Sequence, residues 1–258
     1  MRSRTLRGRP RSQTGEVLPP PTWLAQRLLY RDGLILILDK PAGVPVHAGP
    51  GGGINLELYL EALRFGLPRP PALAHRLDRD TSGCLVLGRH RKALARLGRL
   101  FAGGRVEKVY WTVVRGAPPR PEGRVDLALS KRSEQRGWWM QPNPQGQPAV
   151  TDYRTLGRAA DLTWLECRPR TGRTHQIRVH CAELGCPVLS DPVYGPRDAP
   201  PARLHLHARS VAVPLYPNRP PVTATAPPPE HMLEALRRCG YAGASEETSV
   251  TEGEQAWA

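Results

Sequence analysis

The sequence has no long hydrophobic run, and no apolar segment follows its basic N-terminus. A helix that crosses a bilayer needs about twenty consecutive apolar residues, so we expect no membrane span. Residues 1–15 lack the apolar stretch that defines a secretory signal. With 258 residues, the chain is still long enough to bury a sizeable core. We therefore expect a globular, cytoplasmic protein.

Cysteine is scarce, and its spacing does not indicate disulfides or a metal site. The five Cys, an odd number, include no C-x-x-C pair, so we expect reduced thiols. Several His and Cys pairs occur, but none has the C-x2-C or H-x3-H spacing typical of zinc, and no HExxH motif is present. These pairs are His175 with His180, Cys181 with Cys186, and His205 with His207. The sequence therefore predicts no bound metal.

Motifs for nucleotide cofactors and for hydrolases are missing as well. No GxGxxG sequence follows a predicted strand, and no P-loop is present. Thr81, Ser82 and His75 contain the residue types of a serine hydrolase, but the GxSxG turn is absent. We therefore expect a function without a cofactor.

Acidic residues are few relative to basic ones. The chain has 37 Lys and Arg against 23 Asp and Glu, which gives a net charge of +14, and only four of the basic residues are Lys. Five Arg among the first eleven residues are nearly balanced by four Glu among the last eighteen, so the centre of the chain carries the excess. A body this basic favours a polyanionic partner, because phosphate contacts release counterions. An arginine-rich genome composition explains the preference for Arg, but it explains the shortage of acids less readily.

Composition divides the chain into three parts. Residues 1–21 are rich in Arg and Pro and are predicted to be disordered. Residues 241–258 are small, polar and acidic and are predicted to form a loose tail. Residues 22–240 are predicted to form a single domain without internal repeats.

Within this domain, predicted strands outnumber predicted helices. Short apolar or alternating segments between Gly, Pro and Asn predict strands, and apolar residues at helical spacing predict helices. The predicted strands cover residues 34–38, 84–87, 106–114, 125–129, 138–141, 150–156 and 162–167, and the predicted helices cover 56–63, capped by Asn55, 91–102 and 174–184. These elements do not alternate regularly. We predict an α+β fold with a mostly antiparallel mixed sheet flanked by a few helices.

Three polar segments are candidates for a functional site. Residues 75–83, HRLDRDTSG, lie beside a predicted strand, although a capped turn with solvated ion pairs is the commoner reading of such a segment. Lys108 and Tyr110 share one strand face, where Tyr110 either stacks on a base or belongs to the core. On the helix predicted after a Thr171 or Thr174 cap, Arg178 lies at the edge of the apolar stripe. It either reaches into a cleft or is a surface or phosphate-binding cation.

Five segments together resemble the RluA-type pseudouridine synthases in type and order. They are LDKPAGVPVH (38–47), HRLDRDTSG followed by CLVLGR (75–89), EKVYWTVVRG (107–116), RPRTGRTHQIRVHCAELGCPVLSDPVYG (168–195) and LHLHARSVAVP (204–214). The resemblance implies a central active-site cleft and a cofactor-free isomerisation of uridine to pseudouridine in structured RNA, either ribosomal or transfer RNA. Residues 22–240 would then be the catalytic domain. We expect a monomer without the S4 domain that many relatives carry.

The resemblance also implies roles for individual residues. Asp78 is the catalytic carboxylate, Tyr110 stacks on the base, and Arg178 pairs with Asp78, with Arg173 as the alternative. Whether Asp78 attacks C1′ or the base, or removes the 2′ proton, is left open. Arg76 resembles the residue that fills the gap left by a flipped uridine or holds its phosphate. The remaining residues assigned to substrate binding are Arg79, Arg173, His175, Leu206 and Lys40.

Three positions depart from the family pattern, and two other functions remain as alternatives. Cys84, Cys186 and Ser190 replace more typical residues, but none of them is a proposed catalytic position. One alternative is a catalytically silent RNA-binding or ribosome-assembly protein. The other is a zinc-dependent nucleic-acid enzyme.

Overall fold

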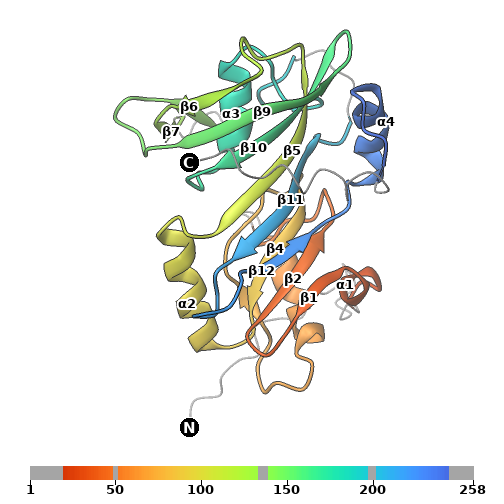
Figure 1. Ribbon diagram of the computed structural model, residues 1–258. Coiled ribbons are helices and arrows are strands. Elements are labelled where there is room, and N and C mark those ends of the chain that lie inside the picture. Colours follow the sequence, from red (N-terminus) through yellow and green to blue (C-terminus); the bar gives the residue numbers. More distant parts are fainter. Residues whose placement is uncertain (1–19, 49–51, 133–138, 197–201, 244–258) are drawn as a thin grey trace.

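A computed structural model describes residues 20–48, 52–132, 139–196 and 202–243 (Figure 1). Most of the two terminal segments, predicted to be disordered, therefore lies outside the described residues. The domain boundaries stay predictions for that reason.

A ten-stranded mixed sheet forms the centre of the molecule. Its main path runs β1-β2-β4-β11-β5-β10-β9-β6, with β12 added to β11 and β3 added to β4. All of these pairings are antiparallel except the one between β11 and β4. The strands are β1 (Leu28–Arg31), β2 (Ile35–Lys40), β3 (Ala72–Leu73), β4 (Ser82–Gly88), β5 (Glu107–Arg115), β6 (Glu122–Asp126), β9 (Val150–Arg158), β10 (Leu162–Pro169), β11 (Leu206–Val213) and β12 (Val222–Thr225). The predicted fold class is confirmed.

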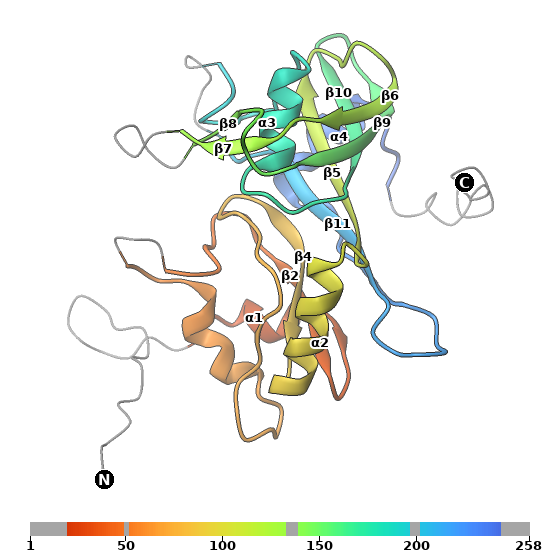
Figure 2. The ribbon, with the colours of Figure 1, turned by 90° about the vertical axis from the view of Figure 1, so that its left-hand side faces the viewer.

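A small hairpin and five helices complete the described fold. The hairpin pairs β7 (Leu129–Lys131) with β8 (Met140–Pro142). The helices are α1 (Trp23–Gln26), the 3-10 helix η1 (Leu56–Leu63), α2 (Arg91–Ala102), α3 (Gln176–Glu183) and α4 (Glu230–Arg238). In Figure 2, α2 lies beside one half of the sheet and α3 beside the other.

Strands β2 and β4 are buried on both faces, which explains their continuous apolar sequences. Ile35 and Ile37 belong to a core cluster that includes Leu97 of α2. Leu36 and Leu38 belong to a second cluster that includes three leucines of η1. Burying one leucine contributes about 1.5–3 kcal/mol, so covering both faces fixes this half of the sheet.

The other half of the sheet is sandwiched in the same way by α3 and α4. Ile177 of α3 packs in a cluster with Val114 and Leu165, and Met232 of α4 packs in a cluster with Trp111. Tyr110 of β5 packs against both the η1 cluster and the α3 cluster, so it lies where the two halves meet.

Most predicted elements are confirmed, but some details were wrong. The helix predicted at residues 91–102 is α2, while the strand predicted at 125–129 is divided between β6 and β7. The helix predicted from residue 174 begins at Gln176, because His175 has a left-handed backbone, and neither Thr171 nor Thr174 caps it. The helix after Asn55 is a 3-10 helix, and the Asn55 amide donates to the Gly53 carbonyl instead of capping it.

Candidate active site

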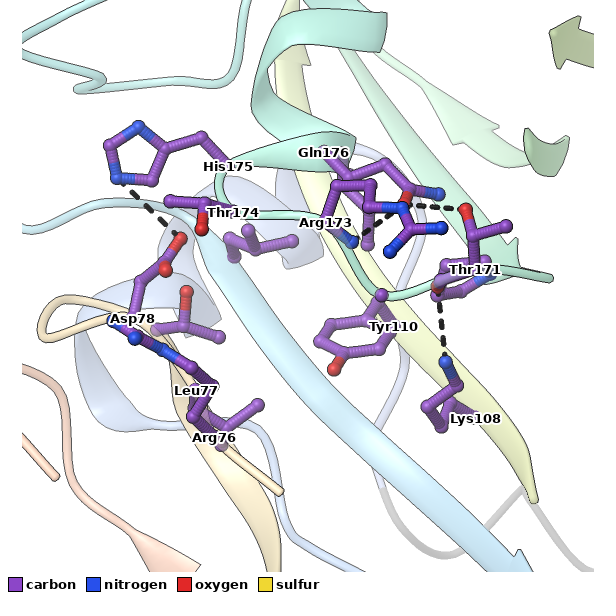
Figure 3. A pocket seen from close by; sticks show the side chains of 15 residues that line it. Arg76, Leu77, Asp78, Lys108, Tyr110, Thr171, Arg173, Thr174, His175 and Gln176 are labelled. Carbon is purple, nitrogen blue, oxygen red and sulfur yellow. Dashed lines mark hydrogen bonds and ion pairs between the residues drawn. The ribbon is translucent and has the colours of Figure 1, made fainter. Parts of the chain in front are cut away.

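A pocket opens where the two halves of the sheet meet (Figure 3). One wall is the loop before β4, which carries Arg76 and Asp78. Lys108 and Tyr110 of β5 form a second wall, and residues 171–177 at the start of α3 form a third. Segments far apart in the sequence therefore converge on one cavity.

The Asp78 loop is held by buried polar contacts. The Nε2 atom of His75 accepts a hydrogen bond from the Val86 amide at 2.9 Å, and its ring stacks on Phe101 at 4.6 Å. Burial lowers the pKa of His75 to about 3, so the ring stays neutral and keeps its acceptor. After the loop, at the start of β4, Gly83 has φ +102, and a Cβ there would collide with the Ala208 carbonyl. These contacts fix where the carboxylate of Asp78 can lie.

Asp78 faces two nitrogen atoms without bonding tightly to either. Its Oδ2 atom lies 3.9 Å from Nη1 of Arg178 and 3.9 Å from Nε2 of His175. The Asp78 side chain is 20% exposed, whereas that of Arg178 is 6% exposed. Both separations exceed hydrogen-bond length, so the Asp78 oxygens remain available to another group.

Arg178 is held by a different aspartate. Its Nε and Nη2 atoms donate to the two oxygens of Asp191 at 2.7 and 2.8 Å, and its guanidinium lies 5.2 Å from the centre of the Tyr194 ring. The Val193 and Tyr194 amides also donate to Asp191. Although burial acts to raise the pKa of Asp191, the bonds from Arg178 hold it below its ordinary value. The charge of Arg178 is thereby fixed next to Asp78.

His175 is oriented by a hydroxyl. Its Nδ1 atom lies 3.0 Å from the hydroxyl of Tyr194, and that oxygen accepts a hydrogen bond from the Met140 amide at 2.9 Å. The hydroxyl proton is then free to be donated to Nδ1, which leaves the proton of a neutral imidazole on Nε2, facing Asp78. Burial lowers the pKa of His175, which favours this neutral form.

Tyr110 and Lys108 line the pocket on the β5 side. Burial raises the pKa of Tyr110, and the nearby negative charge of Asp78 raises it further, so the phenol stays neutral. Lys108 donates to the Thr171 carbonyl at 3.2 Å, and burial lowers its pKa. Leu206 of β11 adds an apolar contact in the same cavity. A neutral ring beside an apolar side chain suits a flat, uncharged ligand such as a base.

The predicted substrate-binding residues do not all lie in this pocket. Arg76 and Arg173 line it, and Arg76 makes no side-chain hydrogen bond or ion pair in the described part of the chain. Lys40 lies outside the pocket, fully buried, and donates to the carbonyls of Pro41, Val44 and Arg79. The Arg79 side chain is 71% exposed, also lies outside, and donates to the Gly43 carbonyl. Lys40 and Arg79 therefore connect the Asp78 loop to residues 41–44, outside the pocket.

Sequence reasoning missed Asp191 and Tyr194, which hold Arg178 and His175. Both residues belong to the DPVYG segment, residues 191–195, which is recognisable in the sequence. That segment alone does not indicate which residues its side chains bind. Within the described residues, no group of three His, Cys, Asp or Glu is placed to hold a metal ion. No described helix is both long and apolar enough to cross a bilayer.

Known proteins resemble this chain in both sequence and fold. A family model described as RNA pseudouridylate synthase matches residues 34–183. An RNA pseudouridine synthase of Zymomonas mobilis, itself uncharacterized, is 44% identical over 80% of this chain and 95% of its own length. The ribosomal large subunit pseudouridine synthase D of Xanthomonas campestris is 36% identical over 90% of this chain and 77% of its own length.

A solved structure extends this similarity to the fold. The human RNA pseudouridylate synthase domain containing 4 has a TM-score of 0.72 and 27% identity, and it covers 84% of this chain and 94% of its own. The fold and the sequence thus define an isomerase that acts on uridine in RNA. The chain belongs to the RNA pseudouridylate synthase family, and its resemblance to the RluA-type members is confirmed.

Proposed function

We propose that this chain converts uridine to pseudouridine in ribosomal RNA, with Asp78 as the catalytic carboxylate and residues 22–240 as the catalytic domain. Several relatives are named for the large ribosomal subunit, and that RNA is the first substrate to test. Transfer RNA is the alternative. The geometry that carries the proposal is a partly exposed carboxylate 3.9 Å from each of two nitrogen atoms, in the wall of a pocket that a tyrosine also lines.

The reaction rearranges bonds without any change in oxidation state. The N1–C1′ bond breaks, the uracil turns, and a C5–C1′ bond forms. The proton lost from C5 is matched by one gained at N1, so reactant and product have the same atoms. An ionised Asp78 can attack C1′ or the base, or it can remove the 2′ proton. A kinetic isotope effect with 2′-deuterated uridine separates the last route from the first two.

In this role Asp78 faces a fixed cation. Arg178 is already bonded to Asp191, so it supplies positive charge 3.9 Å away without occupying the Asp78 oxygens. The Nε2–H of His175 adds a second donor on the same side. Charges preorganised in this way need no rearrangement when the reaction begins.

The remaining wall residues suit an extruded base. Taking a uridine out of its stack costs a few kcal/mol, which stacking and phosphate contacts must offset. Tyr110 would stack on the uracil, and the guanidinium of Arg76 would hold a phosphate or fill the vacated space. Leu206 would contact the base edge, and Arg173, at the rim, is suited to a second phosphate.

Pseudouridine mapping tests this function. The purified chain is incubated with unmodified transcripts of ribosomal RNA and, separately, of transfer RNA, and new pseudouridines are mapped against a reaction without enzyme. We expect modification of one or a few uridines in ribosomal RNA. Modification of transfer RNA alone would replace the proposed substrate. Binding without any pseudouridine would instead favour the catalytically silent RNA-binding protein.

A further inference from the structure

A second concave surface lies between α2 and the connection from β11 to β12, and both views place these two segments side by side (Figures 1 and 2). We call it the α2 groove. Its lining residues include Arg96, Arg99 and Arg105, together with Tyr216 and Asn218. The α2 groove lies outside the pocket that contains Asp78, and the proposed reaction does not involve its residues.

The three arginines of the α2 groove carry charge that their neighbours do not neutralise. None of them forms a side-chain hydrogen bond or an ion pair within the described ranges of the chain, and α2 itself contains no acidic residue. The carboxylate of Asp32, which accepts hydrogen bonds from Tyr216, a second hydroxyl and two amides, contributes one negative charge against these three positive charges. The groove therefore concentrates positive charge.

Two pairs of arginines elsewhere on the surface each share an acidic partner, unlike the arginines of the α2 groove. Arg154 and Arg168 both contact Glu166, at 3.0 and 2.9 Å. Arg124 and Arg170 share Asp152 in the same way, both at 2.6 Å. At these two places, but not in the α2 groove, an acidic side chain offsets the charge of the arginines.

The α2 groove also lies close to the active-site pocket along the chain. Arg105 lies two residues before β5 and precedes Lys108 by three residues, a distance of about 10 Å in an extended chain. Lys108 lines the active-site pocket and also a neighbouring cavity that reaches Gly104. A flexible polyanion that enters the pocket can therefore extend into the groove over a few repeat units.

From this arrangement we infer that the α2 groove binds the phosphate backbone of the RNA strand flanking the target uridine. This inference rests on the proposed function, because RNA is the polyanion that occupies the pocket. Guanidinium groups bind phosphates through paired hydrogen bonds, and such contacts position a strand without reading its sequence. The groove would thus favour long RNA substrates over a minimal loop.

Binding measured against salt concentration tests the inference. The variant R96Q/R99Q/R105Q is compared with the parent on an unmodified large-subunit ribosomal RNA transcript and on a short stem-loop containing the mapped uridine. We expect the variant to bind the long RNA at least about tenfold more weakly. The salt dependence should fall as well, because each lost single-strand phosphate contact removes about 0.7 from the slope. The affinity for the short RNA should be the same in variant and parent.

Two controls separate this effect from others. R115Q/R158Q/R237Q removes the same charge from exposed positions on β5, β9 and α4, away from the groove, and should weaken binding less than threefold. R96K/R99K/R105K keeps the charge and should restore most of the affinity. Equal losses in the groove variant and the charge-matched variant would overturn the inference, as would a lysine variant that binds no better than the glutamine one. If the parent forms no pseudouridine but the binding difference persists, the proposed function fails while the groove stands.

Discussion

Asp78 and Asp191 face the same guanidinium, yet their surroundings are opposite. Asp191 has a fully buried side chain, accepts two hydrogen bonds from Arg178 and accepts two more from backbone amides. Asp78 is 20% exposed and lies 3.9 Å from Arg178, beyond hydrogen-bond length. One carboxylate is saturated, and the other is open to the pocket.

The difference shows how the site keeps a reactive carboxylate beside a cation. If Arg178 were bonded only to Asp78, it would occupy the oxygens that the reaction needs. Asp191 instead holds the guanidinium of Arg178 in position. Arg178 therefore offers Asp78 its positive charge without a hydrogen bond. Substitutions and a change of pH test this difference between the two aspartates.

The largest effect on stability is expected from Asp191→Asn. Removing one member of a buried ion pair leaves the other uncompensated, which costs about 3–5 kcal/mol of unfolding free energy. Asp78→Asn should change that free energy by no more than about 0.5–1 kcal/mol, because it breaks no hydrogen bond to Arg178. Urea unfolding at pH 7 measures both values. Equal losses would remove the distinction between the two aspartates.

Arg178→Lys should lower turnover by about 10²-fold while it keeps the positive charge. A lysine ammonium cannot make the forked pair of bonds to Asp191, so its position beside Asp78 is lost. Single-turnover pseudouridine formation measures the rate. Arg238→Lys, at an exposed ion pair with Asp161, serves as the matched control and should turn over like the parent. A fully active Arg178→Lys would show that charge alone is sufficient.

Part of this arrangement was predictable from the sequence, because it depends on local patterns. Apolar residues at helical spacing predicted α2 with its observed bounds, and the resemblance of HRLDRDTSG and four other segments to a known family pointed to Asp78. The partner of Arg178 was not predictable in this way. Asp191 lies thirteen residues further along and reaches Arg178 only through the tertiary fold. Lys40 shows the opposite case. Its motif was conspicuous and predicted substrate binding, but the side chain donates to backbone carbonyls and does not line the pocket.

Tyr194→Phe should have an intermediate effect. Without the hydroxyl, the Met140 amide loses its acceptor and His175 loses the donor that fixes its tautomer, at a cost of about 1–3 kcal/mol in stability. We expect turnover to fall several-fold, and NMR of the His175 ring should show a mixture of tautomers. Tyr30→Phe, outside the pocket, should leave that NMR signal unchanged. An unaltered tautomer in Tyr194→Phe would disprove the orienting role of the hydroxyl.

The smallest effect concerns acid stability. The pKa of Asp191 is lowered in the folded state, so its stabilisation is present above its unfolded pKa of about 3.9 and is lost as the pH falls through the folded value. The stability gap between the parent and Asp191→Asn should therefore be constant above about pH 5 and shrink below pH 4. Urea midpoints at pH 6, 5, 4 and 3 measure the gap. A gap that widens in acid would contradict the lowered pKa.

The most direct test of the account is a single-turnover assay of Asp78→Asn, with enzyme in excess over RNA and binding verified in the same sample. The account predicts RNA binding and unfolding free energy close to those of the parent, and a rate of pseudouridine formation lower by on the order of 10⁴-fold. Normal turnover by this variant would contradict the central claim that the open carboxylate beside Arg178 performs the chemistry.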